Sequence, residues 1–124
     1  IRDRVDFLGY VPDSDLPERY ASADIFALPS DYEGMPLTVL EAAASGTAVL
    51  ASPRAATDFV TGEMGIVLEP DPTSIAATID KLARNPDRTT RMGEVARKRA
   101  ESYSWAAVAE QYESLYNDLV SRKN

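Results

Sequence analysis

Two glutamates, Glu33 and Glu41, are separated by seven residues in a segment that combines a loop with the start of a helix. Glu33 belongs to the loop, and Glu41 falls about five residues inside the helix, roughly 7.5 Å along its axis. One carboxylate near the mouth of a helix and another along its wall can hold opposite ends of an elongated ligand. A plainer interpretation makes Glu33 a partner of the helix dipole and Glu41 a solvated surface residue. Spacing alone does not separate the two.

The start of this helix offers a second chemical feature, a site for an anion. Pro36 has no N–H, so the amides of Leu37, Thr38 and Val39 would be the free donors of the first turn. Such donors, together with the positive end of the helix dipole, suit a phosphate. Gly34 lets the backbone approach a ligand closely. The segment follows an expected strand, and ligands of open parallel sheets bind where the strands end.

Short apolar runs in the first seventy residues predict the strands that position this segment. The expected strands are 5–8, 24–28, 48–51 and 65–68. The last three are almost continuously apolar, which is typical of parallel strands covered on both faces. Helical spacing predicts helices between the strands, at 16–23 and from 37 to a stop at Gly46, with a single turn at 57–60. This alternation predicts an α/β fold, a three-layer parallel sheet of about four strands.

From residue 72 onward the pattern is helical throughout. Breaks are expected at Asn85-Pro86 and before Ser104, and Ser104 is a suitable N-cap for the last of three helices. This last helix carries a stripe of large apolar side chains at helical spacing: Trp105, Val108, Tyr112, Leu115, Tyr116 and Leu119. We interpret the stripe as core packing, with docking against another domain as the alternative. We expect one domain over 1–124, made of a β/α part (1–70) and a tail of C-terminal helices (71–124).

Composition narrows the classes of function. The 124 residues include no Cys and no His, which excludes a thiol nucleophile, a His-dependent triad and most transition-metal sites. The net charge is −7, so no nucleic-acid partner is expected, because binding a phosphate backbone requires a basic surface. The chain begins with Ile1 and has no apolar run near the roughly 20 residues of a membrane span. We expect a segment of a longer cytoplasmic protein.

The segment around the two glutamates resembles a known family. Pro29-Ser30 stands before the pair, Gly34-Met35-Pro36-Leu37 between its members and Ala42 directly after it. This arrangement is similar to the E-x7-E motif of group 1 retaining glycosyltransferases. Further runs resemble the same family: Val5 to Val11, Tyr20 to Ile25, Gly65 to Leu68 and Ser104-Trp105. The resemblance covers nearly the whole chain.

This resemblance implies a GT-B enzyme with two Rossmann-like domains, of which the C-terminal one binds the donor. The chain would be the C-terminal part of that donor domain. The enzyme would transfer a sugar from a nucleotide diphosphate sugar to an acceptor, as in polysaccharide biosynthesis. The acceptor domain would precede this chain in the parent protein, so the isolated chain would be inactive. The family implies no cofactor and no metal, because amide groups and basic side chains neutralise the leaving diphosphate.

The resemblance also implies roles for individual residues. Glu33 would be the catalytic residue that faces the donor sugar as the glycosidic bond breaks, and Glu41 would bind the ribose hydroxyls. The backbone between them would contact sugar hydroxyls and phosphate. This stretch comprises Gly34, Met35, Pro36, Leu37 and Thr38. The nucleotide base would lie beside Gly9, Tyr10 and Val11.

Three features depart from the family pattern. Ala55-Ala56 stands where Gly-Gly is usual, and Met35-Pro36 replaces an aromatic-Gly pair, which removes one amide donor. The family's first two strands of this domain are not in the chain, which would leave strand edges exposed. We therefore expect the strand at 5–8 to pair directly with the strand at 24–28, or to join a second copy of the chain in a homo-oligomer.

Two other functions stay open, a non-catalytic nucleotide-binding or interaction module and a sugar-nucleotide isomerase of GT-B architecture. A binding module has no need of Glu33, and an isomerase converts its donor without an acceptor. Separately, five basic side chains crowd one helix: Arg88, Arg91, Arg97, Lys98 and Arg99. We interpret them as a solvated helix face. The alternative is peripheral contact of the parent protein with the inner face of the membrane.

Overall fold

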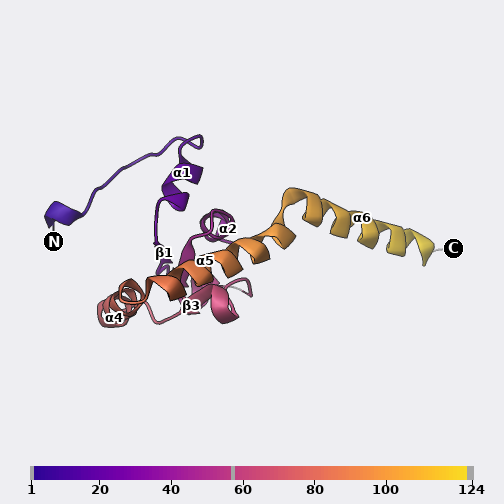
Figure 1. The fold of residues 1–124 in the computed structure, drawn as a ribbon. Coiled ribbons are helices and arrows are strands. Elements are labelled where there is room, and N and C mark those ends of the chain that lie inside the picture. The colour runs from indigo at the N-terminus through magenta and orange to yellow at the C-terminus, as the bar shows by residue number, and fades with distance from the viewer. Residues whose placement is uncertain (1, 57, 123–124) are drawn as a thin grey trace.

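The structure, a computed structural model, describes residues 2–56 and 58–122. Three parallel strands form one sheet in the order β1 (Ile25–Leu28), β2 (Ala48–Ala51) and β3 (Gly65–Val67). The helices are α1 (Leu16–Ala21), α2 (Leu37–Ala44), α3 (Pro53–Ala56), α4 (Pro72–Ala83), α5 (Pro86–Ala100) and α6 (Trp105–Ser121). Single 3-10 turns form at Arg2–Arg4 (η1), Gly62–Met64 (η2) and Glu101–Tyr103 (η3). The α/β class and the three parallel strands from β1 onward are as predicted (Figure 1).

Both faces of the sheet are covered, and β2 shows this most clearly because all four of its residues are buried. Val49 and Ala51 point into a core that α2 and α3 cover. Ala48 and Leu50 point into the opposite core, where Leu82 of α4 packs against them. Two-sided burial explains why this strand is continuously apolar rather than alternating.

Helix α5 passes from one core to the other. Met92, in its first half, packs in the core beneath α4, whereas Ala96 and Ala100 pack in the core beneath α2. The crossing point is Gly93, where a Cβ atom would overlap the carbonyl oxygen of Gly46 and lie 2.8 Å from its carbonyl carbon. Only a residue without a side chain lets α5 lie this close to the turn before β2.

Side-chain caps set the starts of the three C-terminal helices. Asp71 accepts hydrogen bonds from two backbone N–H groups in the first turn of α4, at 3.0 and 2.9 Å. Asn85 caps α5 through one such bond of 3.2 Å. Ser104 caps α6 by accepting from the N–H of Ala107 at 3.2 Å, which confirms its predicted role. Each cap satisfies a donor that the helix itself leaves free.

The expected strand at 5–8 is wrong, so the sheet has three strands rather than four. The stretch after η1 is exposed, with 95% of Phe7 and 56% of Leu8 accessible. Within residues 2–56 and 58–122, β1 pairs only with β2. A strand exists only where a neighbour takes up its N–H and C=O groups, and Val5 to Leu8 meets none. The predicted pairing with β1 is therefore also wrong.

A short helix, α3 (Pro53–Ala56), comes directly before the turn expected at 57–60. The described part of that turn forms, because the N–H of Val60 donates to the carbonyl oxygen of Ala56 at 3.0 Å. Ser52 begins α3, because its hydroxyl accepts a 3.2 Å hydrogen bond from the N–H of Ala55. Ala55 and Ala56 are buried, so this helix turn packs its small side chains against β2 at the place where the family pattern has two glycines. Thr57, at the start of the expected turn, lies outside the described residues.

Helix α6 extends away from the sheet and the other helices (Figure 1). The core-packing interpretation of its stripe is wrong, because Trp105 is 84% exposed and Tyr112, Leu115, Tyr116 and Leu119 are all at least half exposed. A helix that projects beyond its neighbours has no apolar surface to cover its own. The stripe is thus an unpaired apolar face, as the alternative interpretation expects.

Candidate functional site

The segment with the two glutamates connects β1 to α2 at the edge where the strands end. Two contacts tie it to the neighbouring loop after β2. The hydroxyl of Ser52 donates to the carbonyl oxygen of Ser30 at 2.5 Å, and a guanidinium nitrogen of Arg54 lies 3.5 Å from the carbonyl oxygen of Asp31. The loop that carries Glu33 is therefore anchored where ligands of open parallel sheets bind, and Arg54 adds a positive charge beside it.

The N-terminus of α2 lacks a side-chain cap. Pro36 occupies the N-cap position, and no described side chain accepts a hydrogen bond from the first turn. The N–H of Val39 donates to the carbonyl oxygen of Pro36 at 3.0 Å, so the expectation of three free donors is wrong. Two remain, on Leu37 and Thr38. Both sit at the positive end of the helix dipole.

The two glutamates have different surroundings. Glu33 is partly buried and has no hydrogen-bond or ion-pair partner in the part of the chain that the structure describes. Glu41 is exposed, and its Oε2 accepts a 3.1 Å hydrogen bond from the hydroxyl of Tyr20. The backbone of Glu41 is held within α2, where Ser45 donates to its carbonyl oxygen through both N–H and hydroxyl. One carboxylate is thus free and the other is oriented.

Three of the predicted site residues line one open groove of about 650 Å³ between α2 and the start of α6. They are Met35, Leu37 and Glu41. The opposite wall includes Arg97 and Trp105. The predicted segment therefore borders a surface hollow that is mostly apolar and carries charged groups of both signs.

The structure does not bring the other predicted segment to this groove. The chain before α1 extends away from the sheet toward the N terminus (Figure 1). Gly9 and Tyr10 are exposed there, and Val11 is partly buried. Their role beside the nucleotide base stays a prediction.

Comparison with known proteins identifies the chain. Residues 1–99 match the family model for glycosyl transferases group 1. The chain belongs to this family. A D-inositol 3-phosphate glycosyltransferase from Corynebacterium glutamicum (strain R) is 38% identical over an alignment that covers 100% of this chain and 30% of the relative. The chain therefore spans about a third of the length of such a relative.

Solved structures agree with this family assignment. A sucrose-phosphate synthase from Thermosynechococcus elongatus superposes with a TM-score of 0.86 at 31% identity, over 97% of this chain and 31% of that protein. The C-terminal domain of a group 1 glycosyltransferase family protein from Francisella tularensis gives 0.69 at 28% identity, over 77% of this chain and 51% of that one. The group 1 chain thus has the fold of a GT-B glycosyltransferase domain.

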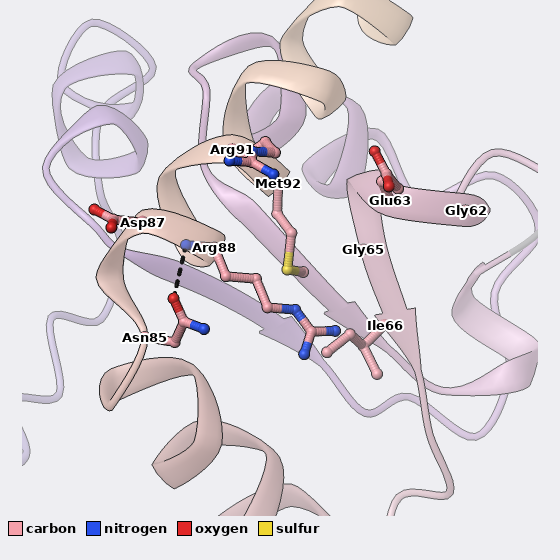
Figure 2. Close-up of a pocket in the computed structure, with 9 residues that line it drawn as sticks. All are labelled: Gly62, Glu63, Gly65, Ile66, Asn85, Asp87, Arg88, Arg91 and Met92. Atoms are coloured by element: carbon pink, nitrogen blue, oxygen red, sulfur yellow. Dashed lines mark hydrogen bonds between the residues drawn. The ribbon is translucent and has the colours of Figure 1, made fainter.

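The chain has a further pocket of about 550 Å³ beside the start of β3 (Figure 2). Arg88 reaches across it toward Ile66, and Asn85 caps α5 at its rim (Figure 2). Arg88 and Arg91 are balanced there by Glu63 and Asp87, so the pocket has no net charge. None of the predicted site residues lines it.

The basic residues of α5 are all exposed, as expected if they form a solvated face of the helix. Arg99 also donates a 3.0 Å hydrogen bond to the carbonyl oxygen of Asp58, and its guanidinium lies 5.8 Å from the ring centre of Phe59.

No helix among the described residues is both long enough and apolar enough to cross a bilayer.

Tyr20 contacts Glu41 but is not among the predicted site residues. Its place in the helix expected at 16–23 indicates only a packing position. Partial burial, the hydrogen bond to Glu41 and the negative charge of that carboxylate raise the pKa of Tyr20 from 10.0 to about 12. The phenol therefore stays a hydrogen-bond donor further into the alkaline range than an ordinary tyrosine does.

The raised pKa of Tyr20 predicts a stability loss at high pH. The unfolded chain releases this proton near pH 10.0 and the folded chain near pH 12, so the stabilisation is complete below the first value and is lost toward the second. Denaturant unfolding of wild type and Tyr20→Phe across this window checks it. We expect the stability advantage of wild type to shrink from pH 10.0 to about 12; an advantage that stays constant contradicts it.

Proposed function

We propose that the chain is the donor-binding part of a retaining glycosyltransferase and holds a nucleotide diphosphate sugar. The observation that carries this proposal is the uncapped N-terminus of α2 with a carboxylate on each side, Glu33 before it and Glu41 within it. A diphosphate needs hydrogen-bond donors and positive potential, whereas a sugar and a ribose offer hydroxyls to carboxylates. The start of α2 has free N–H groups for the diphosphate, and the carboxylates for the hydroxyls lie before it and within the helix.

In this proposal the free amides of Leu37 and Thr38 bind the leaving diphosphate, and their fixed dipoles stabilise its growing negative charge. Pro36 and Gly34 shape the backbone that faces the sugar, and Met35 lines the wall of the groove. Arg54, anchored to the same loop, adds positive charge. These groups neutralise the diphosphate without a cofactor or metal.

Glu33 acts at the other end of the donor. Its free carboxylate faces the sugar and stabilises the positive charge that develops at the anomeric carbon as the bond to diphosphate breaks. Glu41 accepts hydrogen bonds from the ribose hydroxyls. We propose further that the acceptor is bound by a domain elsewhere in the full-length enzyme, so that the chain alone binds donor without transferring sugar.

The proposal is tested by titrating the isotope-labelled 124-residue chain with UDP, GDP and ADP and following backbone amide shifts. We expect shifts concentrated at Leu37, Thr38 and Glu41 for one of the three nucleotides, and the identity of that nucleotide names the base. Glu41→Ala is expected to abolish them. Glu113→Ala, an exposed change on α6, is the matched control and is expected to preserve them.

The same titration is repeated with the full-length enzyme. If no nucleotide moves these amides in either protein, the donor-binding proposal is contradicted. If shifts appear at the base-proximal segment as well, Val11 and its neighbours take the predicted place beside the nucleotide.

A further inference from the structure

The hydroxyl of Tyr20 is the sole described side-chain donor to the Glu41 carboxylate, at 3.1 Å. We infer that Tyr20 is a positioning residue for donor binding: its hydroxyl fixes the Glu41 carboxylate in the orientation that receives the ribose hydroxyls of the nucleotide. The inference rests on the proposed function and assigns a role to a residue outside the two-glutamate segment.

Tyr20 is held at its backbone and at its ring. The hydroxyl of Thr47 donates to the carbonyl oxygen of Tyr20 at 2.6 Å, which ties the end of α1 to the buried start of β2. The ring packs edge-on against Phe26 of β1, with centroids 5.7 Å apart and planes at 74°. Phe26 in turn packs against the core beneath α2. The phenol therefore presents its hydroxyl from a fixed position.

Glu41 has a fixed backbone but an exposed side chain. A free glutamate samples several rotamers, and ordering them at the moment of binding reduces affinity. The hydrogen bond from Tyr20 selects one of them in advance. The fold brings the two side chains together across 21 residues of sequence, from the end of α1 to the middle of α2.

The carboxylate retains enough capacity for a ribose. An ionised carboxylate has about four lone-pair sites, and Tyr20 uses one of those on Oε2. Two vicinal hydroxyls need two more. Because a phenol is neutral, the Glu41 charge is not cancelled as it would be by Lys or Arg, and the carboxylate remains a strong acceptor.

A double-mutant cycle in the full-length enzyme tests the inference, with Tyr20→Phe and Glu41→Ala alone and combined. Tyr20→Phe keeps the ring contact with Phe26 and removes only the hydroxyl. We expect it to raise the donor KM by about three- to tenfold, the size of one hydrogen bond to a charged group near solvent, with kcat nearly unchanged. In the Glu41→Ala background, which has no acceptor for the Tyr20 hydroxyl, the same change is expected to have little further effect on KM.

Two readouts separate positioning from simple packing. A donor that lacks one ribose hydroxyl is expected to lose most of its sensitivity to Tyr20→Phe. Tyr112→Phe, the same chemical change on exposed α6, is the matched control for removal of a phenol, and melting temperatures confirm that each variant is folded.

The outcomes distinguish this inference from the proposed function. If Glu41→Ala weakens donor binding but Tyr20→Phe raises KM equally in both backgrounds, Tyr20 acts through packing and the inference is overturned while the donor site stands. If Tyr20→Phe has no effect on KM, it is overturned in the same way. If Glu41→Ala leaves the donor KM unchanged, the proposed role of Glu41 fails and the inference fails with it.

Discussion

Replacing Glu33 with Gln is expected to reduce sugar transfer by the full-length enzyme by more than about a hundredfold, the usual cost of removing one preorganised electrostatic group. Gln keeps the size of the side chain and one acceptor oxygen, and it removes the charge. Glu33 is partly buried and has no partner among the described residues, so little else depends on that charge. We expect kcat to fall and the KM for the donor to change little, because the charge acts as the glycosidic bond breaks.

Steady-state transfer with donor and acceptor checks this, with Glu63→Gln as the control. Glu63 is exposed to solvent and lines the remote pocket beside β3, and its variant is expected to retain activity. Unchanged transfer in Glu33→Gln would favour a binding module that does not need the carboxylate. Consumption of donor in the absence of acceptor would favour an isomerase.

Replacing Gly93 with Ala is expected to destabilise the domain by about 3 kcal/mol, at the upper end for overpacking of a core. The added Cβ would overlap the carbonyl oxygen of Gly46, which is backbone and cannot rotate away. Helix α5 would have to move off the turn before β2. Because Met92 and Ala96 lie in opposite cores, that movement loosens both.

Denaturant unfolding measures this loss, and failure of Gly93→Ala to fold is the extreme form of the same result. Gly34→Ala is the matched control for stability. The Cβ built at Gly34 meets no atom within 4 Å, so its variant is expected to lie within about 0.5 kcal/mol of wild type. Equal stability of the two variants would contradict the close approach of α5.

The core of the fold could be predicted from local pattern, whereas its N-terminal edge could not. Residues 48–51 are predicted as a strand buried on both faces because all four are apolar. The end of α2 could be predicted because glycine commonly follows a helix, and Gly46 does so with a φ of 83°. Val5 to Leu8 also has a pattern that predicts a strand. Its failure depends on the absence of a neighbour, which composition does not encode.

The candidate site divides in the same way. The helix start predicted between Glu33 and Glu41 is confirmed, whereas the roles of the two carboxylates stay predictions. The contact from Tyr20 was missed, because α1 and α2 are separated by a strand and only the tertiary fold joins them. The predicted number of free N–H groups at the start of α2 was too high by one, because the N–H of Val39 donates to the carbonyl oxygen of Pro36.

The path of α5 has a consequence for how the domain opens. One helix supplies side chains to the cores on both faces of the sheet, so neither layer can detach while the other stays packed. Helix α2, which carries the candidate site, packs directly against α5. Slow amide exchange in α2 should therefore follow the global unfolding equilibrium rather than a local opening. The backbone of the candidate site thus shares the cooperativity of the entire sheet, and a ligand bound there is expected to slow amide exchange in α4 on the far side as well.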